Sequence, residues 1–102
     1  MKYYFTDKTG KIEGSADTTL HLRLKAFKYI ESRIKKDEWY NVVVYNDRHH
    51  LVGFLYGYKN PLGKYATTQS EMWYEFEEHK GMHITKYRLH PITGRKISEA
   101  KR

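Results

Sequence analysis

The chain has 102 residues, which is enough for one hydrophobic core, and folding at this size buries roughly two thirds of the unfolded chain's surface. Hydrophobic residues are 39% of the chain, and many of them are its ten tyrosines, four phenylalanines and two tryptophans. Because disordered chains are poor in aromatics, the body of this chain is expected to fold.

The net charge and the cysteine content indicate which binding partners and which cellular location to expect. Nineteen Lys and Arg against twelve Asp and Glu give a formal net charge of +7, which favours polyanions, acidic proteins or anionic membranes as partners. The absence of cysteine excludes disulfides and thiolate metal sites. No stretch approaches the roughly 20 apolar residues that span a bilayer. The absence of such a stretch predicts a cytoplasmic protein. Of the partners that the charge favours we expect nucleic acid or a protein, and no membrane.

The first half of the chain predicts a strand followed by a helix. Residues 2–6 read as an edge strand closed by a turn at 7–10, and residues 11–13 could return as a weak second strand. A helix is predicted over residues 18–36, capped by Asp17, Thr18 or Thr19. Its apolar stripe recurs at spacings of 4, 3, 3 and 4 residues and consists of Leu20, Leu24, Phe27, Ile30 and Ile34.

A central hairpin is predicted from two aromatic and β-branched runs, residues 38–45 and 51–58. If Asn46 pairs with Leu51, the strands have two different faces. One face carries aromatic side chains and a valine, namely Trp39, Tyr45, Val52, Phe54, Tyr56 and Tyr58. The other carries Tyr40, Val42, Val44 and Leu55 with Gly53 and Gly57. Residues 65–68 are a further candidate strand.

The last hairpin is predicted from residue chemistry. A turn at Lys80-Gly81, with His79 facing Met82, would place Trp73 opposite Arg88. The same register would pair Glu75 with Lys86, Tyr74 with Tyr87, and Met72 with Leu89. The predicted fold is therefore α+β, with one long amphipathic helix on an antiparallel sheet of about four to six strands, in the order β-α-β-β-(β)-β-β. Residues 1–94 would form this single domain, and residues 95–102 a short, basic, flexible tail.

Basic residues give the first candidate surface. The predicted helix has one acid, Glu31, and a basic face without interleaved acids lacks the i,i+4 ion pairs that often stabilise solvated helices. One interpretation is that this face contacts phosphates together with basic residues near the C-terminus. The other is a lysine-rich surface that only keeps the protein in solution. The candidate residues are His21, Lys25, Lys28, Lys35 and Lys36 on the helix, with Arg88, Arg95 and Lys96 beyond it.

Aromatic residues on the predicted strands give the second candidate surface. They would stack nucleic-acid bases, form a dimer or partner interface, or be the true core with the glycine face outside. The candidates are Trp39, Tyr45, Phe54, Tyr56, Tyr58 and Trp73.

Catalytic motifs are weak. Residues 57–65 resemble a phosphate loop, but one residue too many separates the glycines, and Tyr65 stands where a Ser or Thr belongs. Glu78-His79-Lys80 matches a nuclease fragment that is common by chance. The six histidines show no helical i,i+4 ligand pair. We predict no catalytic residues, no metal and no cofactor.

Three functions follow, in order of preference. The first is a small non-enzymatic nucleic-acid-binding protein that uses the basic helix face and the basic C-terminus. The second is a phage-type interaction module, or an inhibitor of a host nuclease or other nucleic-acid machine, that binds through aromatic residues and through acids on strand 71–77. The third is a metal-free ribonuclease that uses His49, His50 or Lys80. A homodimer is compatible with the aromatic face.

Overall fold

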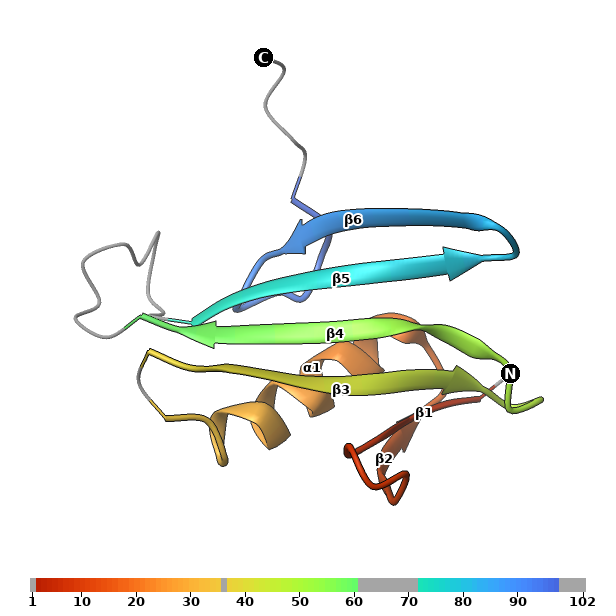
Figure 1. Cartoon of the computed structure of the whole chain (residues 1–102), viewed down its shortest axis with the longest axis horizontal. Coiled ribbons are helices and arrows are strands. Elements are labelled where there is room, and N and C mark those ends of the chain that lie inside the picture. The colour runs from red at the N-terminus through yellow and green to blue at the C-terminus, as the bar shows by residue number, and fades with distance from the viewer. Residues whose placement is uncertain (1, 36, 61–71, 98–102) are drawn as a thin grey trace, which may run out of the picture.

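The computed structural model describes residues 2–35, 37–60 and 72–97, which form one helix and a six-stranded antiparallel sheet (Figure 1). This confirms the predicted α+β fold, and the weakly predicted second strand is present. The predicted strand at 65–68 lies outside the described residues. The elements are β1 (Tyr3–Thr6), β2 (Ile12–Ala16), α1 (Thr19–Glu31), β3 (Trp39–Asn46), β4 (Leu51–Lys59), β5 (Met72–Lys80) and β6 (His83–Leu89).

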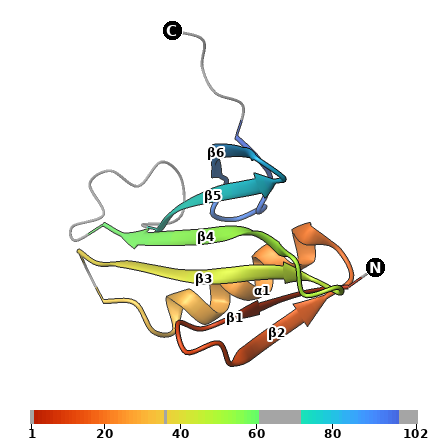
Figure 2. The same ribbon diagram turned by 45° about the vertical axis from the view of Figure 1, so that its right-hand side comes forward.

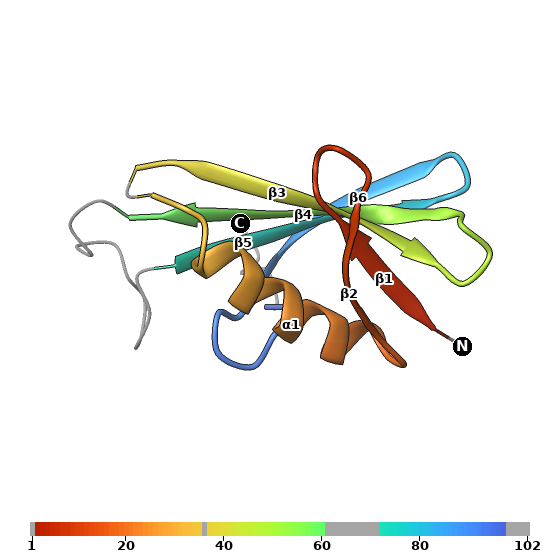
Figure 3. The same ribbon diagram turned by 90° about the horizontal axis from the view of Figure 1, so that it is seen from below.

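The strand order across the sheet is β2-β1-β3-β4-β5-β6, with β2 at one edge and β6 at the other (Figure 2). The helix α1 crosses one face of the sheet, and no other described helix or strand lies over the opposite face (Figure 3). We call this opposite face the open face. Among the described residues, no helix is both long enough and apolar enough to span a membrane.

The helix begins where predicted but ends earlier. Thr18 is the N-cap, and its side-chain oxygen accepts a hydrogen bond from the His21 N–H at 3.1 Å. The helix α1 ends at Glu31, with Ser32 as its C-cap. The Arg33 N–H donates to the Ile30 carbonyl three residues back, which tightens the final turn, and the Ile34 N–H makes the last i→i−4 bond to the same carbonyl. The predicted end at residue 36 was therefore wrong. Lys35 follows the helix, and Lys36 lies outside the described residues.

The buried stripe of α1 is rotated from the predicted one. Its buried side chains are Leu22, Ala26, Phe27 and Ile30. Leu20 and Leu24 are only half-buried, because they lie toward the C-terminal loop near Gly94 instead of under the sheet. The Phe27 ring stacks on Tyr74 of β5, with ring centroids 3.7 Å apart and planes 7° apart. This stack joins the helix to the first part of β5.

The central hairpin has the predicted register along most of its length. Trp39 pairs with Tyr58 and Val44 with Gly53, but a bulge then pairs Tyr45 with Leu51, so the predicted Asn46–Leu51 pair was wrong. The extra residue of the bulge is Val52, which packs against the core and not on the aromatic face as predicted. The bulge turns the Val52 side chain to the other face of the sheet, and the amino-acid sequence around Val52 did not predict a bulge.

The last hairpin is shifted by two residues from the predicted register. Lys80 pairs with His83, so the turn is Gly81-Met82, with Gly81 at φ +60° as the first residue of a two-residue hairpin turn. Because the shift is an even number, every side chain keeps its predicted face. The actual pairs include Glu75–Arg88, Phe76–Tyr87, Glu77–Lys86 and Tyr74–Leu89.

Residues after β6 fold back along its outer edge. Leu89 forms a bridge with Lys96, the Ile97 N–H donates to the Arg88 carbonyl at 2.9 Å, and the His90 N–H donates to the Arg95 carbonyl at 2.8 Å. Residues 98–102 lie outside the described residues, so the tail beginning at residue 95 stays a prediction.

Buried tyrosines should make the domain sensitive to alkali. Burial and then a hydrogen bond to Glu31 raise the pKa of Tyr74. Burial and then a hydrogen bond with Tyr40 raise the pKa of Tyr29 to about 12. Unfolded tyrosines ionise near pH 10, so above that pH the unfolded chain loses protons that the folded chain keeps. We expect the free energy of unfolding to fall from about pH 10 upward in urea titrations. A flat profile would contradict this, and Tyr74→Phe should reduce the slope.

Candidate functional site

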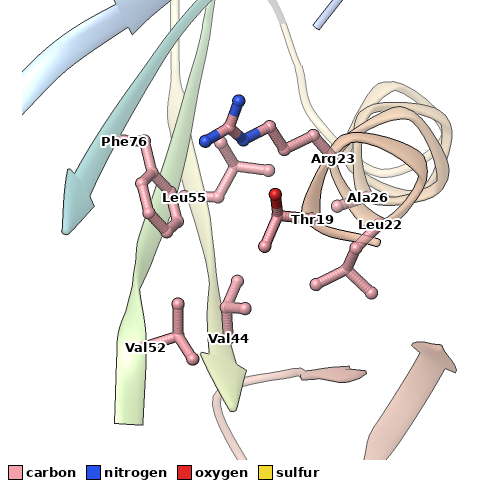
Figure 4. Close-up of a pocket in the computed structure, with 8 residues that line it drawn as sticks. All are labelled: Thr19, Leu22, Arg23, Ala26, Val44, Val52, Leu55 and Phe76. Atoms are coloured by element: carbon pink, nitrogen blue, oxygen red, sulfur yellow. The ribbon is translucent and has the colours of Figure 1, made fainter. Parts of the chain in front are cut away.

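A small apolar pocket lies between α1 and the sheet (Figure 4), where Thr19, Leu22, Arg23 and Ala26 of the helix face Val44, Val52, Leu55 and Phe76. It holds about 10 Å³, close to the space of a single water molecule. Arg23 beside it donates to the Gly94 carbonyl at 3.2 Å and to the Tyr87 hydroxyl at 3.1 Å. This arginine holds the C-terminal loop to the helix, and the pocket is too small for a substrate.

The outer side of α1 carries an exposed basic surface, which we call the cationic helix face: His21, Lys25 and Lys28. His21 and Lys25 line an open hollow together with Lys2 and Asp17. Lys25 donates to the backbone carbonyl of Ser15 at 2.7 Å, which fixes its ammonium group beside β2. The ion pairs within the described residues are Lys80–Glu78 and His79–Glu77, so neither helix lysine is matched by a carboxylate there. The one acid of the helix, Glu31, instead accepts a hydrogen bond from Tyr74 at 2.8 Å.

The other predicted basic residues that the structure describes do not join this surface. Lys35 lies beyond the helix, and its N–H donates to the Glu38 carboxylate. Arg88 lies on the open face, with its guanidinium 4.1 Å from the centre of the Trp73 ring. Lys96 is at the β6 edge, with Nζ 4.8 Å from the centre of the Tyr87 ring, and Arg95 is exposed next to it. The structure thus brings Lys25 and Lys28 together and separates both from Arg88.

All six predicted aromatic candidates lie on the open face. The glycine face holds the core, because Gly53 and Gly57 are buried and a methyl group on Gly57 would come within 2.9 Å of Ile30. The alternative in which the aromatic residues form the core was therefore wrong. The aromatic residues of the open face are Tyr45, Phe54, Tyr56, Tyr58 and Trp73, which are half-buried, and Trp39, which is 56% exposed.

Neighbouring rings on the open face contact one another. Trp39 and Tyr58 have ring centroids 5.0 Å apart, and those of Tyr45 and Tyr4 are 5.6 Å apart. Tyr4 is a member of this surface that the sequence analysis missed. The run at residues 2–6 predicted only a short edge strand, without an assignment of its faces. That prediction was wrong, because β1 lies between β2 and β3, with Tyr4 opposite Tyr45.

Charges on the open face come in opposite pairs. In the β5–β6 register Glu75 lies opposite Arg88 and Glu77 opposite Lys86. Glu77 also contacts His79 at 2.7 Å and accepts a hydrogen bond from the Tyr56 hydroxyl at 3.4 Å. Burial and then the charge of Glu77 raise the pKa of Tyr56. Glu75 and Glu77 therefore lie beside cations and do not form a purely acidic stripe. Glu71, the third acid of the predicted acidic strand 71–77, lies outside the described residues.

The histidines are dispersed. His79 faces Glu77, while its neighbour Glu78 accepts a hydrogen bond from Tyr87 at 3.2 Å on the other side of β5. His49, in the β3–β4 turn at φ +63°, forms a hydrogen bond with the Tyr4 hydroxyl. In the described part of the chain no hydrogen bond or ion pair joins His49 or His50 to Lys80, and no three His, Asp or Glu side chains gather as metal ligands.

No protein-family model, curated protein or solved structure matches this chain. Function has to be inferred from its two opposite surfaces, the cationic helix face and the open face.

Proposed function

We propose that the chain is a small non-enzymatic nucleic-acid-binding protein that contacts phosphates through its cationic helix face. The observation that carries the proposal is that Lys25 and Lys28 are exposed side by side on α1 and are not matched by a carboxylate among the described residues. A cytoplasmic location belongs to the same proposal.

Lysines without a carboxylate partner suit phosphate binding for a physical reason. Each cation that neutralises a phosphate releases condensed counterions, which supplies most of the affinity of sequence-independent binding. A lysine already held by a carboxylate would have to give up that ion pair first. Lys2 and His21, which line the same hollow as Lys25, would extend the contact toward the start of β1.

Because the two surfaces lie on opposite sides of the sheet, a nucleic acid bound to the cationic helix face cannot also have its bases recognised by the open face. A nucleic acid lying on α1 is on the opposite side of the sheet from Trp39 and the other open-face aromatic residues. Its bases would not stack on those rings, and phosphate contacts position a nucleic acid without reading its sequence. We therefore expect weak sequence preference and strong salt dependence.

Neutralising the two helix lysines should weaken binding and its salt dependence together. Fluorescence anisotropy with labelled duplex DNA would compare the natural chain with the double variant Lys25→Gln/Lys28→Gln. Two lost phosphate contacts should lower the slope of log affinity against log salt by about 2. The control is Lys8→Gln, which removes one exposed lysine from the turn between β1 and β2.

The outcomes distinguish binding through the cationic helix face from binding through the net positive charge of the whole protein. If the control reduces the slope as much per lysine as the double variant does, the helix face has no special role. An unchanged slope in the double variant, or no binding by the natural chain at low salt, would contradict the proposal.

A second candidate function rests on the open face. Exposed tryptophan and clustered tyrosine are typical of protein interfaces and their hot spots. On this alternative the chain is an interaction module or inhibitor that covers a nucleic-acid-processing protein with its open face. Isolation of a stoichiometric protein partner that is lost on substitution of Trp39 would support it.

A further inference from the structure

We infer that the open face binds a second copy of this chain, so that two sheets pack face to face in a symmetric dimer with α1 on each outer side. The inference starts from the absence of a cover. No described helix or strand lies over this face, yet it carries six aromatic side chains at strand spacing, and Trp39 is 56% exposed. Aromatic side chains gathered on an uncovered sheet face are typical of an interaction site.

The size of the face fits one folded partner. The strands β4 and β5 have nine residues each. At about 3.3 Å per residue and about 4.8 Å between strands, β3 to β6 cover about 520 Å² as a flat sheet. Side chains project from the sheet, and Tyr4 of β1 adjoins it, so the accessible area of the open face is larger than this flat area. It approaches the roughly 800 Å² that each partner buries in a standard interface. Two sheets of equal size can pack in this way about 10 Å apart, with strands within about 30° of each other.

The charges of the face select a second copy as the occupant. Two chains that each carry a net charge of +7 repel one another over most of their surfaces. On the open face the formal charges cancel, because Glu75 and Glu77 lie opposite Arg88 and Lys86. A symmetric interface needs a self-complementary surface, and a face that offers both signs beside an apolar centre meets that requirement. The same cancellation makes the face unattractive to a polyanion.

The dimer has a consequence that rests on the proposed function. With both sheets inside, the two cationic helix faces point outward on opposite sides of the assembly. Each dimer would then hold two separate nucleic-acid segments, which a monomer cannot do.

The dimer itself is tested without nucleic acid by sedimentation equilibrium of the full chain over a range of concentrations. The expected result is a mass that rises to twice the 12.3 kDa of the chain. Trp39→Glu would bury two carboxylates in the interface and should raise the dissociation constant by at least about tenfold, as expected for an interface hot spot. The matched control is Ile92→Glu, because Ile92 is also an exposed apolar residue, at 51%, but lines a hollow beside α1. This control should leave the mass profile unchanged.

Folding of each variant is checked by circular dichroism. If Trp39→Glu is not folded, Glu75→Lys is used instead, since it turns a neutral face positive in both copies without changing the apolar centre. The inference is overturned if the natural chain stays monomeric at about 100 µM, a concentration far above the dissociation constant of a dimer of micromolar affinity. So does a dimer that both open-face variants leave intact, and so does a monomer whose open face captures a different protein. None of these results bears on nucleic-acid binding, which is measured separately on the helix-face variants.

Discussion

Replacing Phe27 by alanine should destabilise the domain by about 3–5 kcal/mol, the usual cost of removing a buried phenylalanine ring. Phe27 is 3% exposed and lies flat on the Tyr74 ring, with centroids 3.7 Å apart. This stack joins α1 to β5, two elements that are distant in sequence. The variant would leave a cavity under the centre of the sheet and loosen Tyr74, whose hydroxyl also bonds to Glu31 at 2.8 Å.

Urea unfolding followed by circular dichroism measures this loss. Phe27→Leu keeps most of the buried volume and should cost less than half as much. Leu20→Ala serves as a second control, because Leu20 is only half-buried on the same helix. Equal losses in Phe27→Ala and Leu20→Ala would show that the ring stack does not anchor the helix.

Gly53→Ala should destabilise the sheet at or above the upper end of the roughly 1–3 kcal/mol range for overpacked sites. A methyl group there would lie 2.2 Å from the backbone carbonyl oxygen of Glu77 and 2.8 Å from the Phe76 ring. The oxygen belongs to the neighbouring strand and cannot move aside without breaking the β4–β5 ladder. Glycine is therefore required here for close approach of two backbones and not for an unusual φ.

The matched control is Asn41→Ala, an alanine at an exposed position in the middle of β3. Both variants are compared by thermal unfolding at the same protein concentration. We expect a large drop in Tm for Gly53→Ala and a change within about 0.5 kcal/mol for the control, as for ordinary surface substitutions. A Gly53→Ala protein of normal stability would mean that β4 and β5 are farther apart than the structure shows.

The alternation of residue types along the predicted strands correctly predicted that the aromatic candidates share one face of the sheet. Alternation along residues 38–58 separated the aromatic face from the glycine face, and the structure placed all six aromatic candidates together on the open face. Even the wrong register of the last hairpin kept the correct faces, because an error of two residues preserves alternation. Arg88 and Trp73, predicted as a directly opposed pair, still contact each other diagonally at 4.1 Å.

A strand bulge and the end of a helix could not be predicted from residue alternation in the same way. The bulge at Val52 and the early end of α1 at Glu31 depend on backbone hydrogen bonds that residue types do not specify. The buried stripe of the helix was rotated because the C-terminal loop, anchored by Arg23, takes up Leu20 and Leu24. The location of Lys28 on the helix and of Arg88 on the open face follows from the arrangement of the two layers, which no spacing along the chain encodes.

Stability is distributed unevenly in this domain. Val42 and Leu55 are almost wholly buried between α1 and the sheet, whereas β6 is exposed on both sides from His83 to Lys86. Such a strand end has few apolar contacts to lose when it opens, so its amides can exchange with solvent while the central strands stay closed. The hairpin of β5 and β6 is thus a unit that can detach at its tip and close again, and its motion need not involve the helix or the strands under it.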